Sequence, residues 1–373
     1  MSTSTIIFIW APFVGKVGTE LAMVNYARAL RDGGKNVQLV SVAGEFLDYG
    51  SEFECISLRP IKFISKLITA PVFRGRLLAL YCFIAAVKLR FKIPANVTII
   101  AGLNAIPLLF VFRVLKRQER IIVSVQGFPK FLLKEKQNIF YSGENLLRKF
   151  IWSRFYAKAD KLITMTLGTK ARLKATFSFP RVDVISNPLF QIAPPLRKWR
   201  ANRGVNILYV GRLSYQKDPD LFIQVARIAQ QVHPELSFSI MGTGEEEERL
   251  RKLSSDLSNI KFLGYVQNPW KHYENENLVH LVTSRWEDPG HAMLESMARS
   301  IPTLVVRRDS PHSELATEYG AQVCDISSEQ INEAIIRVIS DIDLTTLTSI
   351  AEKVSSDFSL SNFSKSLGGS LHE

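Results

Sequence analysis

Short apolar runs alternate with stretches of helical periodicity along the chain, and this alternation limits what it can fold into. Residues 6–10 form a strand-like run, residues 19–32 carry apolar side chains on one helical face, and residues 37–42 form the next run. In the second half, residues 206–210 form a run that precedes helical spacing from Leu221. Strands that alternate with helices build parallel sheets covered by helices. The sequence therefore predicts an α/β protein.

The length and the proline-rich middle predict two domains. The chain has 373 residues, 46% of them hydrophobic, which suffices for two cores in domains of about 150–200 residues each. Asn187-Pro188 and Pro194-Pro195, followed by Arg197-Lys198-Trp199-Arg200, predict a linker. We expect a first domain over residues 1–190, a second over residues 191–357, and a tail over residues 358–373 that crosses back to the first domain or frays. Both domains should be Rossmann-like and doubly wound, and should face each other across a ligand-binding cleft.

Two glutamates, Glu287 and Glu295, flank the turn between a predicted strand and a predicted helix. The apolar run 278–283 precedes them, and Gly290 stands where the helix should begin. A helix N-terminus offers unpaired N–H groups and a partial positive charge to a diphosphate. Glu295, one turn into the helix, can reach ribose hydroxyls, and Glu287 can accept hydrogen bonds from a sugar. The alternative is that Glu287 and Asp288 cap the helix while Glu295 is solvated.

A second strand-to-helix loop carries two cations. Gly211 and Arg212 follow the run 206–210, and Lys217 precedes the next helical stretch. Arginine can grip a diphosphate as a planar fork, and lysine can do so as a point charge. The alternative is a solvated surface pair.

Taken in order, these motifs resemble the donor-binding half of the retaining glycosyltransferases of family 4, which have the two-domain GT-B architecture. Gly242-Thr243-Gly244, Phe262-Leu263-Gly264 and Ile301-Pro302 fit the same pattern, whereas Asp288-Pro289 stands where the family commonly has Gly-Phe. The resemblance implies that Arg212 and Lys217 stabilise the departing diphosphate, that Glu287 contacts the donor sugar, and that Glu295 holds the ribose. It also implies a nucleoside-diphosphate sugar as donor substrate, with no cofactor and no metal.

Three further residues are candidates for substrate binding. Gly18, on the first loop with Gly15, matches the position where the family brings that loop against the donor diphosphate, although a Gly-x-x-Gly loop alone is weak evidence. Gln126 stands where many relatives have a His, and its amide can bind a sugar but cannot exchange a proton near neutral pH. Alternatively, Gln126 caps a strand end that faces solvent. His291 follows Gly290 and lies either in the site or on the surface.

Positive charge is concentrated in the first half. Residues 1–200 contain 31 Lys and Arg against 11 Asp and Glu, and the remainder contains 16 against 24. No acidic residue lies between Glu54 and Glu119, where basic and apolar residues interleave as suits an anionic membrane surface. The apolar run 77–87 is too short to span a membrane, so we expect a helix that lies on one. The alternative is an amphipathic helix that packs on the sheet. No recognition module for nucleic acid is found.

The resemblance thus predicts a metal-independent, retaining glycosyltransferase of hexosyl or N-acetylhexosaminyl type. It would move a sugar to a hydroxyl of a lipid-linked or oligosaccharide acceptor in the synthesis of cell-surface polysaccharides or glycoconjugates. The three Cys have no pair spacing, and the first apolar run lacks the basic flank of a secretory signal. We therefore expect a cytoplasmic protein, peripheral on the inner face of the membrane. The alternatives are a non-catalytic, membrane-docked scaffold that binds nucleotide sugars, an epimerase of the same fold, and a basic RNA-binding module.

Overall fold

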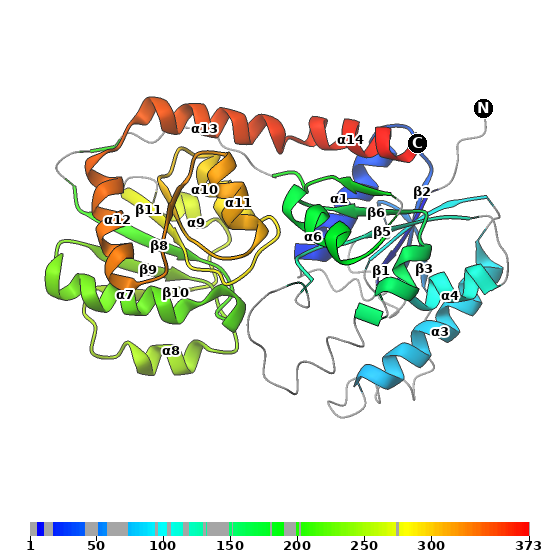
Figure 1. Ribbon diagram of the computed structural model, residues 1–373, viewed down its shortest axis with the longest axis horizontal. Helices are drawn as coiled ribbons and strands as arrows, with labels where there is room; N and C mark the ends of the chain where they lie inside the picture. The colour runs from blue at the N-terminus through cyan, green and yellow to red at the C-terminus, as the bar shows by residue number, and fades with distance from the viewer. Residues whose placement is uncertain are drawn as a thin grey trace. The chain divides into compact units, whose positions relative to one another are not determined.

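The computed structural model describes residues 6–10, 18–41, 51–57, 74–93, 96–102, 106–114, 119–129, 132, 149–150, 152–179, 181–189, 199–200, 203–273 and 276–372. The chain divides into two compact units (Figure 1). The first unit comprises residues 1–187 with 363–373, and the second comprises residues 188–362.

The first unit contains a seven-stranded sheet of order β3-β2-β1-β4-β5-β6-β7, in which every pair of neighbours is parallel. The strands are β1 (Ile6–Trp10), β2 (Val37–Ser41), β3 (Glu54–Ser57), β4 (Thr98–Ala101), β5 (Arg120–Ser124), β6 (Lys161–Thr164) and β7 (Val182–Val184).

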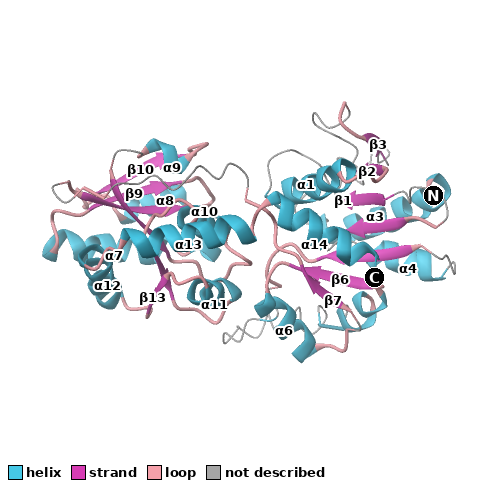
Figure 2. Ribbon diagram, turned by 90° about the horizontal axis from the view of Figure 1, so that it is seen from above, coloured by secondary structure: helices cyan, strands magenta, loops and turns pink. Residues whose placement is uncertain are grey.

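Helices cover both faces of this sheet (Figure 2), because successive strand residues point to opposite sides. Ile99 and Ile121 pack in one core with α3 (Arg74–Lys92) and α4 (Ile106–Val114). Ile100 and Ile122 pack in the other core with α1 (Gly18–Asp32) and α14 (Leu360–His372). The unit also contains η2 (Tyr156–Lys158) and α6 (Leu167–Thr176).

The second unit contains a six-stranded parallel sheet of order β10-β9-β8-β11-β12-β13. Its strands are β8 (Val205–Val210), β9 (Ser237–Met241), β10 (Ile260–Gly264), β11 (Asn277–Val282), β12 (Thr303–Val306) and β13 (Gln322–Cys324). The order runs outward in both directions from β8 and β11. Ligands of open α/β sheets bind beyond the carboxyl ends of the strands at such a switch point.

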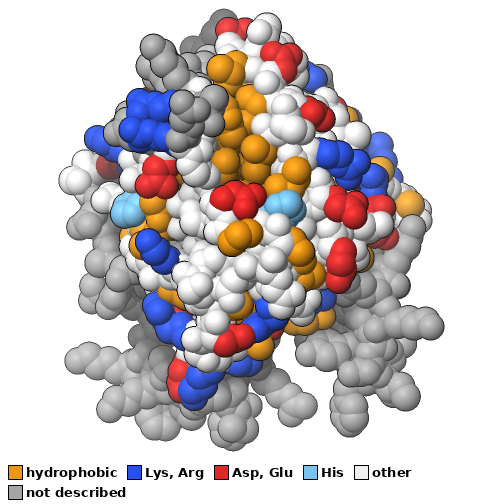
Figure 3. Space-filling model, turned by 90° about the vertical axis from the view of Figure 1, so that its left-hand side faces the viewer, with side chains coloured by type: hydrophobic (Ala, Val, Ile, Leu, Met, Phe, Trp, Pro, Cys, Tyr) orange, Lys and Arg blue, Asp and Glu red, His pale blue; other side chains and the backbone are white. Residues whose placement is uncertain are grey.

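Two helical layers enclose the second sheet. Ile207 and Val279 pack against α7 (Pro219–Val232) and α12 (Ser328–Ser340), whereas Val282 and Val305 pack against the layer of α10 (His291–Met297) and α13 (Leu344–Asp357). The remaining elements are η3 (Tyr215–Lys217), α8 (Glu247–Leu253), α9 (Pro269–His272) and α11 (Pro311–Glu318). On the face shown in Figure 3, acidic and basic side chains lie interspersed.

The end of the chain differs from one of the expectations for it. The Ser- and Gly-rich segment does not fray, because it forms the helix α14, whose Phe363 and Leu367 lie in the core of the first unit. Phe363 packs on Tyr26 of α1 with 4.6 Å between ring centroids. These apolar residues, four apart, outweigh the low helix propensity of the adjacent Gly368 and Gly369.

The apolar run 77–87 lies in α3, which is longer than the run itself. Ala85, Ala86 and Leu89 are buried in the core, as the packed-helix alternative predicts. Phe83, Ile84 and Phe91 nevertheless remain 39%, 38% and 79% exposed. The helix thus packs on the sheet and also presents apolar side chains to its outer side. None of the helices in the described ranges is long and apolar enough to cross a membrane.

Candidate active site

The candidate site forms at the carboxyl ends of β8, β11 and β12. These three strands are parallel neighbours, so the loops that follow them leave the sheet at the same edge. The loops comprise residues 211–218, 283–290 and 307–310. Seven of the nine residues expected to act on the donor lie on the first two loops or on the helix that follows the second loop. They are Gly211, Arg212, Lys217, Glu287, Gly290, His291 and Glu295.

The first loop is set by close contact with the loop after β9. The Gly211 N–H donates to the Met241 carbonyl at 3.0 Å, and the Leu213 N–H donates to Thr243 at the same distance. Gly242 has a φ of +145°, and a Cβ there would lie 1.8 Å from the Gly211 carbonyl oxygen. Only glycine allows this approach of two backbones. The Gly242-Thr243-Gly244 motif therefore shapes the cation-bearing loop.

Lys217 and Glu287 form an ion pair across the first two loops, with side chains 22% and 12% exposed. Ser284 Oγ donates to the Glu287 carboxylate at 3.1 Å. Burial alone would raise the pKa of Glu287, but the charge and hydrogen bond of Lys217 lower it overall. The site thus holds an ionised carboxylate beside its cation. Lys217 is therefore not part of a solvated pair, contrary to that alternative.

Arg212 differs from Lys217 in its exposure and its partners. Its side chain is exposed and makes no ion pair with any residue in the described ranges, while Tyr209 Oη donates to its carbonyl at 2.8 Å. The backbone at Arg212 is therefore held, and its guanidinium is available to an anion.

A buried carboxylate that the sequence did not single out joins all three loops. Asp218 is 4% exposed and has a φ of +51°, which side-chain-bearing residues rarely adopt. It accepts from Arg285 Nη2 at 2.8 Å and from Arg308 Nη2 at 2.6 Å. Asp218 directly follows Lys217, so these two contacts fix the loop that carries the cation.

Hydrogen bonds to the backbone hold the loops together as well. Thr283 Oγ1 donates to the Lys217 carbonyl at 2.9 Å, and the Glu287 N–H donates to Ser310 Oγ at 3.1 Å. The backbones of Lys217 and Glu287 are thus fixed, and their side chains remain the adjustable parts of the pair.

Gly290 starts α10, as the sequence predicts. Its φ of +92° suits glycine, and a Cβ there would touch Glu287 and His312. Gly290 itself is the N-cap residue, and the Glu287 carboxylate contacts Lys217 and Ser284, so the capping alternative does not describe these contacts of Glu287. The Asp288–Pro289 peptide bond is cis.

Glu295 lies one turn into α10 and is half-buried. Trp270 Nε1 of α9 donates to its carboxylate at 2.8 Å, so the solvated alternative is wrong. Trp270 orients the second carboxylate, and no local pattern in the sequence indicates this partner because it lies 25 residues away on another element.

The histidines near the site are neutral at physiological pH. His291 is half-buried, and burial lowers its pKa to about 4. Burial likewise lowers the pKa of His312 to about 4 and that of His280 to about 3. Positive charge at this edge of the sheet therefore comes from lysine and arginine.

Gly18 and Gln126, the other two candidates, belong to the first unit. Gly18 is the first residue of α1, and Gly15 lies outside the described residues. Gln126 follows β5 and is 7% exposed. Its amide donates to Ser124 Oγ at 2.7 Å and accepts from Asn187 Nδ2 at 2.9 Å. The alternative of a solvent-facing strand cap is therefore wrong, because both ends of the amide have partners within the fold.

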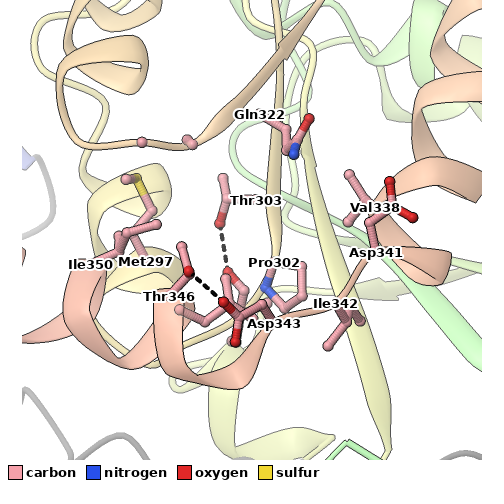
Figure 4. Close-up of a pocket in the computed structure, with 14 residues that line it drawn as sticks. Met297, Pro302, Thr303, Gln322, Val338, Asp341, Ile342, Asp343, Thr346 and Ile350 are labelled. Atoms are coloured by element: carbon pink, nitrogen blue, oxygen red, sulfur yellow. Dashed lines mark hydrogen bonds between the residues drawn. The ribbon is translucent and has the colours of Figure 1, made fainter.

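A hollow that is larger than the one beside Lys217 and Glu287 lies elsewhere in the second unit (Figure 4). It measures about 230 Å³ and includes Thr303 and Gln322, the first residues of β12 and β13. It therefore opens at the amino edge of the sheet, opposite the candidate site. Met297, Val338 and Ile350 line it, and Asp343 accepts a hydrogen bond from Thr346 beside it. Chemistry rather than size thus distinguishes the candidate site.

Comparison with known proteins agrees with this geometry. Residues 197–353 match the model of the family described as glycosyl transferases group 1. An uncharacterized glycosyltransferase of Haemophilus influenzae is 26% identical over 176 residues, which are 46% of this chain and 49% of the relative. The O-antigen biosynthesis glycosyltransferase WbnH of Escherichia coli is 32% identical over 126 residues, 34% of this chain and 35% of that protein. The matched parts thus span about half or less of these relatives.

A solved structure resembles the whole chain. HepE of Anabaena, in complex with UDP, superposes with a TM-score of 0.71 at 16% identity, covering 99% of both chains. At this identity the likeness concerns the fold. The chain has the GT-B fold, and its second unit matches the glycosyl transferases group 1 family.

Proposed function

We propose that the protein is a retaining glycosyltransferase that moves a sugar from a nucleoside-diphosphate sugar to a hydroxyl of a saccharide acceptor. The observation that carries this proposal is the Lys217–Glu287 ion pair at the carboxyl edge of a parallel sheet, with Arg212 on the loop of Lys217 and Glu295 on the helix that follows Glu287. The match to a glycosyl transferases group 1 family model over residues 197–353 supports it.

Stabilisation of the leaving group is the main catalytic task in this proposal. Negative charge accumulates on the diphosphate as the bond to the sugar breaks. Arg212 and Lys217 would neutralise that charge, and the first N–H groups of α10 lack intrahelical partners and could add hydrogen bonds. These groups would do the work of a metal ion, so we propose a metal-independent reaction.

The carboxylates would bind the neutral parts of the donor. Glu287 would accept hydrogen bonds from hydroxyls of the transferred sugar, and Glu295, oriented by Trp270, would accept them from the ribose. Gln126 is an amide and cannot serve as a carboxylate nucleophile. We therefore propose attack by the acceptor on the face from which the diphosphate departs, with retention of configuration.

The first experiment measures heats of binding for UDP, GDP, ADP, CDP and TDP without added metal. UDP is the first probe, because HepE was solved with it. We expect one nucleotide to bind with micromolar affinity and Glu295→Ala to weaken that binding. If none binds, the donor site does not exist as proposed. Consumption of the sugar nucleotide without any acceptor would instead favour an epimerase.

We further propose that the acceptor is lipid-linked and that the first unit docks on an anionic membrane. On the outer side of α3 and α4, Phe91 and Val114 are 79% and 60% exposed, and the Phe83 and Phe110 rings lie 5.9 Å apart. Figure 1 shows these helices side by side. Arg90 and Lys92 of α3 adjoin Phe91 in the sequence, Arg113 of α4 adjoins Val114 and pairs with Asp160, and the sequence from 55 to 118 contains no acid. Such a surface pairs apolar insertion with attraction to anionic lipid.

Vesicle binding tests this docking. We expect vesicles that contain phosphatidylglycerol to bind the protein at low salt and to release it as salt rises. Val114→Glu should weaken binding several-fold, because it adds a negative charge to the contact surface. Val232→Glu is the matched control, since Val232 is 57% exposed on α7 of the second unit. No binding at low salt, or equal loss in both variants, would contradict the proposal.

A further inference from the structure

The ion pair between Lys217 and Glu287 places two groups with different proposed ligands in contact with each other. Lys217 is proposed to bind the diphosphate, and Glu287 is proposed to bind the sugar. In the structure, each is the other's partner, and both side chains are largely buried. A diphosphate that engages Lys217 therefore comes close to a carboxylate that is losing its counter-charge.

That approach is unfavourable for a diphosphate alone. If Lys217 turns to the phosphate, Glu287 keeps the Ser284 hydroxyl as a partner but loses its cation, and a buried charge without its counter-ion is costly. If Lys217 stays between the phosphate and the Glu287 carboxylate, the carboxylate repels the phosphate charge at short range. Thr283 holds the backbone of Lys217, and Ser310 holds that of Glu287. The two loops therefore cannot simply separate to relieve this repulsion.

A sugar attached to the diphosphate offsets the loss of the Lys217 partner at Glu287. Its hydroxyls can donate to the Glu287 carboxylate and replace the hydrogen bonds of Lys217. We propose that the Lys217–Glu287 ion pair selects the intact nucleoside-diphosphate sugar over the free nucleoside diphosphate, and that its re-formation after transfer expels the product. This inference rests on the proposed function.

The test compares the wild type with Glu287→Gln, using UDP and UDP-glucose or the pair whose base the nucleotide panel selects. Glutamine keeps the volume and can still accept from Ser284, but it removes the charge. We expect UDP to bind about tenfold tighter or more, as loss of one charge at short range implies, while UDP-glucose binds no tighter. Unchanged or weaker UDP binding would overturn the inference and leave the proposed function standing.

Two further variants separate this role from a general loss of order. Ser284→Ala leaves Glu287 more dependent on Lys217, so UDP should bind several-fold more weakly, in the opposite direction to Glu287→Gln. Glu295→Gln is the matched carboxylate control, because its partner is Trp270, and it should weaken UDP and UDP-glucose alike. Tighter binding of UDP by Glu295→Gln would contradict the proposal. A change of UDP affinity in the same direction in Ser284→Ala and Glu287→Gln would contradict it too. Absence of nucleotide binding in the wild type would overturn the proposed function as well.

Discussion

At the residue scale, the two cations of the loop after β8 differ in what surrounds them. Arg212 is exposed and has no ion-pair partner in the described part of the chain, whereas Lys217 is paired with Glu287. We expect Arg212→Ala and Lys217→Ala each to lower turnover by about 10²-fold or more, because both lose stabilisation of the leaving group. Steady-state kinetics measures this, and near-normal turnover in both variants would contradict their proposed role.

Stability distinguishes the two variants. Lys217→Ala leaves a mostly buried carboxylate without its cation, so it should lower the free energy of unfolding by about 1–3 kcal/mol. Arg212→Ala removes an exposed side chain and should change it by no more than about 0.5 kcal/mol. Urea unfolding of both proteins checks this, and equal destabilisation would contradict the difference in surroundings between the two side chains.

At the element scale, the sequence predicts the strands and the loop positions well but not the partners between loops. The periodicity places strands at residues 6–10 and 206–210, where β1 and β8 lie, and puts the start of α10 at Gly290. The sequence does not indicate a role for Asp218, because its partners, Arg285 and Arg308, lie 67 and 90 residues away. Pairing them requires knowing that β8 and β12 both flank β11, and apolar periodicity carries no information about strand order.

The ends of α3 and α14 also differ from what the local sequence pattern predicts. An apolar run of 11 residues predicts a short amphipathic segment, but α3 has 19 residues because flanking Arg and Lys residues are good helix formers. Serines and glycines at 359–370 predict fraying, and only the apolar surface supplied by α1 in three dimensions makes a helix there favourable. Tertiary burial thus outweighs local propensity in α14, whereas local propensity extends α3 beyond the apolar run.

At the scale of the whole molecule, the last helix of the chain belongs to the first unit and is held there by a buried lysine. Lys161 of β6 is 2% exposed. Its Nζ donates to the Ser370 carbonyl at 2.6 Å and pairs with Asp183 at 2.8 Å. A cation near the C-terminus of a helix also interacts favourably with the helix dipole. Segments that are separated by about 200 residues in the sequence are thereby joined in one fold.

We therefore expect Lys161→Met to loosen α14. The variant removes the counter-ion of Asp183, which keeps only the Ser370 hydroxyl as donor, and the donor of the Ser370 carbonyl, so the free energy of unfolding should fall by about 2–4 kcal/mol. Hydrogen exchange in α14 should become faster in the variant. Lys158→Met is the control, because Lys158 is exposed on the preceding turn, and it should change stability by about 0.5 kcal/mol or less.

The pH dependence of the free energy of unfolding tests whether Lys161 stabilises the fold through its charge on Asp183. Burial raises the pKa of Asp183, but hydrogen bonds from Lys161 and Ser370 outweigh it and leave the pKa lowered. A carboxyl group with a lowered pKa in the folded state stabilises the fold above its unfolded pKa of about 3.9, and this contribution disappears as the pH falls through the folded value. The difference in stability between the wild type and Lys161→Met should therefore be constant above about pH 5 and shrink below pH 4. A difference that stays constant on acidification would show that Lys161 acts by packing rather than by charge, since packing does not depend on the ionisation of Asp183.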